Sequence, residues 1–165
     1  MEDELSATAR STETVTIRIV RVFLLGLFLF GAIGTGIELL LLDHTEKLWQ
    51  RLPVVLLLVA VPAAGWCALA RGRLSMRIFQ GIMMAFVLSG LAGLWLHYSG
   101  NMEFELEMYP SLGGLELFKK AIRGATPALA PGTMIQLGLL GLAYTFRHPA
   151  LQAAPTDERT DIGEK

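Results

Sequence analysis

The stretch VFLLGLFLFGAIGTGIELLLL, residues 22–42, followed by the polar turn DHTE, decides the fold class of this chain. The run contains a single ionisable side chain, Glu38. About 20 apolar residues in a helix span the ~30 Å hydrocarbon core of a bilayer, so the run predicts a membrane-crossing helix. Arg18 and Arg21 lie just before it, where their long side chains can reach lipid headgroups.

The overall composition also favours a membrane protein. Hydrophobic residues make up 53% of the 165 residues and charged residues 18%, against roughly 25% charged in soluble domains. The net charge of −1 provides no basic field for nucleic acid. The single cysteine, Cys67, excludes an intrachain disulfide and a CxxC motif.

Further apolar segments complete the predicted fold, which is an all-α integral membrane four-helix bundle. The predicted crossings are residues 22–42, 53–70, 78–98 and 129–146, within a membrane domain at 18–148. Residues 1–17 and 149–165 are polar, and we expect them to be cytoplasmic tails, the first one disordered until about Thr14 to Ile17.

The segment between the third and fourth crossings predicts a long outer loop. Glu103, Glu105 and Glu107 alternate with apolar residues, and this period of two predicts an extended segment. Leu115, Phe118 and Ile122 then recur at helical spacing, with charged residues between them. The loop should therefore carry an amphipathic helix that lies in the membrane interface.

Lysines and arginines predict the orientation. One side carries nine: Arg10, Arg18, Arg21, Arg71, Arg73, Arg77, Arg147, Arg159 and Lys165. The other side carries five: Lys47, Arg51, Lys119, Lys120 and Arg123. The positive-inside rule places both termini in the cytoplasm, and the style of composition leads us to expect a bacterial inner membrane.

Small residues on the apolar segments predict helix-packing faces. Gly31 and Thr35 lie on one face of the first crossing together with Glu38, so we expect Glu38 to point into the bundle. The third crossing carries an i, i+4 stripe of small residues: Gly81, Ala85, Ser89 and Gly93. In lipid, such residues let helix backbones approach closely.

Four polar residues are the candidates for a proton or cation site on the outer side: Glu38, Asp43, His44 and His97. An acid inside an apolar run is costly unless it is paired, protonated or hydrated, so Glu38 is the strongest candidate. A metal bound by His44, His97 and Glu38 is compatible with the ligand types, but no HxxxH or HExxH spacing supports it. The alternative is that these side chains make only structural hydrogen bonds, and we predict no cofactor.

Glu103, Glu105 and Glu107 form a second candidate, an acidic site in the outer loop for a hard cation. The alternative is a solvated edge that binds nothing. No serine lies in a GxSxG setting, so the sequence leans against an enzyme.

The leading interpretation is a non-catalytic subunit or accessory of a membrane assembly, whose partners are the lipid bilayer and other membrane subunits or copies of itself. The first alternative is a small proton- or cation-coupled carrier or channel that uses Glu38 and the outer histidines. The second is a membrane-embedded enzyme or redox subunit with a site at the outer surface.

Overall fold

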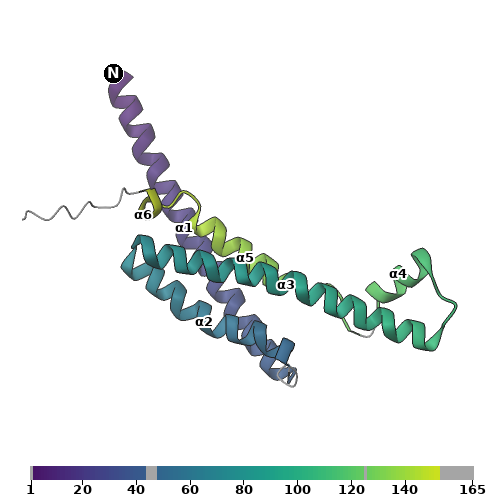
Figure 1. Cartoon of the computed structure of the whole chain (residues 1–165). Helices are drawn as coiled ribbons and strands as arrows, with labels where there is room; N and C mark the ends of the chain where they lie inside the picture. The colour runs from purple at the N-terminus through teal and green to yellow at the C-terminus, as the bar shows by residue number, and fades with distance from the viewer. Residues whose placement is uncertain (1, 44–47, 125, 153–165) are drawn as a thin grey trace, which may run out of the picture.

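The computed structural model describes residues 2–43, 48–124 and 126–152, with side chains from residue 14 onward, and every regular element in this part is a helix. Three helices are long: α1 (Glu2–Leu41), α2 (Leu48–Ala70) and α3 (Arg73–Met108) (Figure 1). Three are short: α4 (Gly114–Ile122), α5 (Gly132–Thr145) and α6 (Pro149–Gln152). The predicted all-α class is therefore confirmed.

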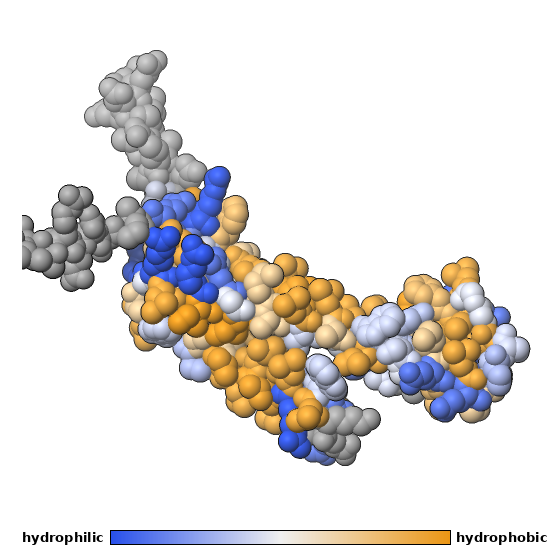
Figure 2. All heavy atoms as spheres, in the orientation of Figure 1, coloured by the Kyte–Doolittle hydropathy of each residue, from blue (hydrophilic) through white to orange (hydrophobic). Residues whose placement is uncertain are grey.

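The three long helices are long and apolar enough to cross a membrane. The qualifying segments are Thr14–Leu41, Leu48–Ala70 and Arg73–Met108. Only 11%, 33% and 22% of their most apolar windows are buried within the chain. Most of their apolar surface consequently faces outward, and Figure 2 shows it over the visible sides of the long helices.

The fourth predicted crossing, residues 129–146, is shorter than expected. Helix α5 has 14 residues, which at 1.5 Å per residue is about 21 Å, less than a ~30 Å hydrocarbon core. Turns precede it, with the amide of Ala130 donating to the carbonyl of Pro127 and that of Gly132 to Leu129. Pro127 and Pro131 restrict helix formation before this point, since proline lacks the amide donor a helix interior needs.

The helices α1, α2, α3 and α5 surround one core. Helix α3 packs on α5 and α2, and α1 packs on α5 and α2. Buried side chains from all four form the core: Phe28, Ala32, Leu57, Ala60, Ala64, Cys67, Met76, Phe79, Met83, Phe86, Met134, Leu137 and Tyr144. The centre is aromatic, with the rings of Phe28 and Phe79 edge-to-face at 5.5 Å and those of Phe79 and Tyr144 at 6.1 Å.

Glycines allow α3 and α5 to approach closely. A Cβ atom at Gly138 would lie 2.7 Å from the carbonyl oxygen of Met83, and one at Gly90 would lie 2.9 Å from that of Pro131. Close backbone contact replaces large side chains here, as expected between helices in lipid.

The residues predicted to line helix-packing faces have different surroundings. A Cβ at Gly31 would lie 2.7 Å from Leu137, and one at Gly93 would lie 2.7 Å from Pro131. Thr35, Ala85 and Ser89 are partly buried. Gly81 is exposed, and a Cβ there would meet nothing within 4 Å.

The acidic segment after the third apolar run is helical, so the predicted extended structure is wrong. Helix α3 continues to Met108, and the amide of Tyr109 closes its last turn on the carbonyl of Glu105. Glutamate, leucine and methionine are strong helix formers, and this propensity together with packing against α4 outweighs the period of two. The loop is correspondingly shorter, and the helix predicted within it is α4.

Helix α1 likewise begins earlier than the sequence pattern predicts. It starts at Glu2, so the expected disorder before Thr14 is wrong for residues 2–13. Of the predicted tail 149–165, residues 149–152 form α6, and the remainder lies outside the described residues.

Candidate functional site

The outer-side residues predicted to form a proton or cation site differ in their exposure to solvent. Glu38 and Asp43 are exposed, and His44 lies outside the described residues. His97 is partly buried on α3, with its Nδ1 atom 3.0 Å from the carbonyl oxygen of Pro127. Within the described ranges, no three His, Cys, Asp or Glu side chains are grouped closely enough to hold a metal ion.

The expectation that Glu38 points into the bundle is wrong. Its neighbours Gly31 and Thr35 are partly buried, but Glu38 is exposed. The length of α5 explains the difference. Glu38 lies about 10 Å along α1 beyond Gly31, whereas α5 extends only about 7.5 Å beyond the Leu137 side chain that covers Gly31.

The helical end of α3 divides the three glutamates of the predicted acidic site. Successive residues turn by about 100°, so Glu103 and Glu107 share one face and Glu105 lies on another. Glu103 and Glu107 are exposed, while Glu105 is partly buried and faces α4.

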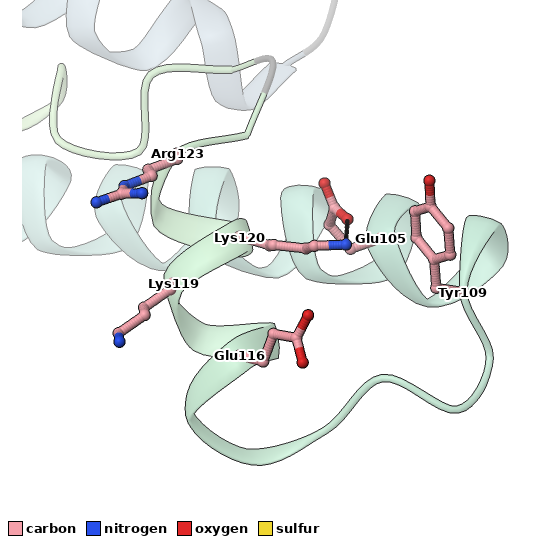
Figure 3. A pocket seen from close by; sticks show the side chains of 6 residues that line it. All are labelled: Glu105, Tyr109, Glu116, Lys119, Lys120 and Arg123. Carbon is pink, nitrogen blue, oxygen red and sulfur yellow. Dashed lines mark ion pairs between the residues drawn. The ribbon is translucent and has the colours of Figure 1, made fainter.

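An open hollow of about 470 Å³ lies between the end of α3 and α4. Its lining residues are Glu105, Tyr109, Glu116, Lys119, Lys120 and Arg123 (Figure 3). The Nζ atom of Lys120 lies 3.7 Å from Oε2 of Glu105 and 4.1 Å from the ring centroid of Tyr109. Lys119 and Arg123 point away from this pair (Figure 3). The charged groups of the hollow therefore attach α4 to α3 and leave two cationic side chains exposed.

A second polar region lies at the opposite end of the helices, and we call it the arginine end. It combines the early part of α1, the α2–α3 turn and the α5–α6 turn. Its basic residues are Arg18, Arg21, Arg71, Arg73, Arg77 and Arg147. Figure 2 shows strongly hydrophilic residues gathered where these segments meet.

Two of these arginines cover the carboxyl ends of helices. The Nη2 atom of Arg21 donates to the carbonyl oxygens of Phe146 at 3.3 Å and Arg147 at 3.1 Å, which ties α1 to the end of α5. The Nε atom of Arg71 donates to the carbonyl of Ala68 at 3.3 Å, at the end of α2. Arg71 and Arg147 have positive φ values of 46° and 48°, the left-handed conformation that commonly ends a helix.

His148 lies beside these arginines. Partial burial lowers the pKa of His148 below its ordinary value of 6.5, and the charges of Arg21 and Arg71 lower it further. The ring is therefore neutral near pH 7. The amide of Ala150 donates to Nδ1 at 3.2 Å, so we assign the ring proton to Nε2.

The sequence predicted the orientation from the arginines and headgroup contact for Arg18 and Arg21, but it did not indicate that they form one cluster. Their concentration near apolar segment ends was the available signal, but which helix ends meet depends on tertiary packing. Asn101, which fastens α4 and the following turn to α3, has no periodic or motif signal.

Comparison with known proteins adds no assignment: no protein-family model matches the chain, and no curated protein or solved structure does so.

Proposed function

We propose that the chain is a small multi-pass integral membrane protein that acts as a non-catalytic subunit or accessory of a membrane assembly. The observation that carries the proposal is the outward apolar surface of α1. Only 11% of its most apolar window is buried within the chain, and Phe30 in that window is 81% exposed. Contiguous apolar surface of this kind marks a membrane or protein interface.

The length and apolar character of the helices support membrane insertion. Helices α1, α2 and α3 would cross the bilayer, and the shorter α5 would complete a four-helix bundle from within it. Trp95 and Tyr98 would then lie at an interface, as aromatic residues commonly do. Helix α3 is about 54 Å long, so its last part and α4 would extend outside the hydrocarbon core.

The charge distribution supports the proposed orientation in a bacterial inner membrane. The arginine end would face the cytoplasm under the positive-inside rule, with α4 on the opposite side. Labelling with a membrane-impermeant maleimide tests this in a Cys67→Ala background. A cysteine introduced at exposed Ser111 should react in intact cells, and one at exposed Arg73 should react only after lysis.

Co-purification tests the subunit role directly. The intact chain, tagged and extracted in mild detergent, should co-purify with membrane proteins in fixed proportion. Replacing Glu38 with Gln should leave this assembly unchanged, because glutamine has the size of glutamate and only the carrier alternative needs a carboxylate that takes up protons. A chain that purifies alone and moves protons or cations in vesicles would contradict the proposal and support the carrier alternative.

A further inference from the structure

Among the described side chains, charge is segregated between the two ends of the molecule. The acidic side chains described by the structure are Glu38, Asp43, Glu103, Glu105, Glu107 and Glu116, and all of them lie toward the end opposite the arginine end. The single ion pair among the described side chains, between Lys120 and Glu105, is at that opposite end as well. The arginine end is thus cationic, with no acidic partner among the described side chains.

We propose that the arginine end binds the phosphate of an anionic phospholipid headgroup, with Arg21 and Arg71 as its principal ligands. The proposal rests on membrane insertion, as part of the proposed function, but not on the subunit role. Basic pockets between transmembrane helices on the cytoplasmic side suit headgroups of this kind.

Donors from different helices lie at this end of the molecule. Arg21 on α1 donates to the carbonyl oxygen of Arg147, the residue before His148, and the ring of His148 lies 6.0 Å from that of Tyr144 at the end of α5. Arg71 lies at the end of α2, where its amide donates to the carbonyl of Cys67. The charges of both arginines also lower the pKa of His148. The hydrogen bonds of Arg21 to Phe146 and Arg147 use only Nη2, and that of Arg71 to Ala68 uses only Nε. A guanidinium has five N–H donors, so each retains donors for phosphate oxygens. The assigned Nε2–H of the neutral His148 ring provides one more.

The surroundings favour a lipid over free phosphate. Exposed apolar side chains adjoin the cationic ones, including Leu69 at 86%, Leu74 at 67% and Phe146 at 68% exposure. On α1, a hollow of about 360 Å³ is lined by Arg18 together with Ile19, Val22 and Phe23. A soluble anion cannot contact these apolar side chains favourably, whereas a phospholipid has acyl chains directly beneath its phosphate that can.

Native mass spectrometry of the full chain tests the proposal after reconstitution in phosphatidylcholine with phosphatidylglycerol as the minor component. The wild type should retain phosphatidylglycerol in preference to phosphatidylcholine. Arg71→Gln should lower this retention about fivefold, and the double variant Arg21→Gln/Arg71→Gln about thirtyfold, the loss expected for one and two charges near anionic lipid. Arg71→Lys should retain most of the preference.

Lys119→Gln is the matched control, because Lys119 is an exposed cation at the opposite end. It should leave retention unchanged. Arg71→Gln is the decisive variant should the double variant misfold, because the hydrogen bond of Arg71 is within its own helical turn. Equal retention of the two lipids by the wild type, or an Arg71→Gln variant that binds like the wild type, would overturn the proposal.

Inorganic phosphate distinguishes the two sources of the ligand. Millimolar phosphate should leave the bound lipid in place, and displacement at that concentration would overturn the lipid assignment. Resistance to alkaline carbonate extraction, measured on the same samples, reports membrane insertion separately. Loss of lipid preference in an inserted protein would therefore contradict this inference alone.

Discussion

Asn101 and Thr126 are joined by hydrogen bonds in both directions. The Nδ2 atom of Asn101 donates to the carbonyl oxygen of Thr126 at 2.7 Å, and the amide of Thr126 donates to Oδ1 of Asn101 at 3.2 Å. Nδ2 also donates to the carbonyl of Ala121 at 2.9 Å. One buried carboxamide thus holds both the end of α4 and the turn before α5 against α3.

Replacing Asn101 with Leu should release α4. The similar size of leucine preserves packing, but it leaves polar backbone groups of Ala121 and Thr126 without their partner. We expect a loss of about 2–3 kcal/mol in the free energy of unfolding. Thermal unfolding in detergent measures the loss, and hydrogen exchange should show α4 exchanging faster.

The control for Asn101→Leu is Glu103→Gln, a change at an exposed position on the same helix. It should leave both measurements unchanged. Equal protection of α4 in the Asn101→Leu variant and the wild type would contradict the assigned role of the carboxamide.

A methyl group at Gly138 should destabilise the fold, unlike one at Gly81. The added Cβ of Gly138→Ala would meet the carbonyl oxygen of Met83 at 2.7 Å, so α3 and α5 must separate, at a cost of about 1–3 kcal/mol. Gly81→Ala enters open space and should stabilise α3 by up to about 1 kcal/mol through helix propensity. Thermal unfolding of the two variants in one detergent provides the comparison. Equal changes in unfolding temperature would contradict the close packing of α3 on α5 at Gly138.

His148 should make stability depend on pH. The unfolded chain protonates this ring near pH 6.5, whereas the folded chain does so at lower pH because its pKa is lowered by burial and by Arg21 and Arg71. The unfolded state therefore binds more protons between the two pKa values, and stability rises with pH through that window. The contribution is fully present above the unfolded pKa and is lost as pH falls toward the folded one.

The measurement is the unfolding temperature from about pH 7.5 to about pH 5.5, compared with a His148→Asn variant. Asparagine does not titrate and can still accept from the amide of Ala150. The variant should lose less stability over this interval than the wild type. If the unfolding temperatures of the two proteins changed in parallel with pH, His148 would not contribute to the pH dependence of stability.

The exposed ion pair of Lys120 should contribute little. Its side chain is 37% exposed, and its contacts with Glu105 and Tyr109 lie at the rim of an open hollow. We expect Lys120→Gln to lower the free energy of unfolding by less than about 1 kcal/mol. The same unfolding assay compares this variant with Asn101→Leu. If Lys120→Gln lost more free energy of unfolding than Asn101→Leu, the ion pair and not the carboxamide would be the main attachment of α4.

The all-α class and the three long apolar helices were predictable because hydrophobic length is a local property of sequence. The extent of α3 was not predictable in this way. Glu103, Glu105 and Glu107 alternate with apolar residues as in a strand, but glutamate itself favours a helix. Helix propensity resolves this conflict together with packing against α4, a tertiary contact that the local pattern does not contain.

The candidate sites were less predictable for the same reason. The position of Glu38 near the end of the first apolar run follows from residue spacing, but its exposure depends on where α5 begins. The meeting of Arg21 with the end of α5 joins segments from opposite ends of the chain, and no local pattern indicates such a contact. The proposed roles of Asp43, His44 and His97 stay predictions.

The shortness of α5 has a consequence for the backbone beside it. In the proposed placement, the turns before Gly132 lie near the interface at Trp95 and Tyr98, because they contact His97 and Asn101 on α3. Backbone groups without helical partners at the edge of the hydrocarbon core are tolerated when protein groups satisfy them. Asn101 does so at Thr126, and the ring nitrogen of His97 lies 3.0 Å from the carbonyl of Pro127. In that placement, these two side chains would take the place of water for the turns that lead into a helix too short to cross the bilayer alone.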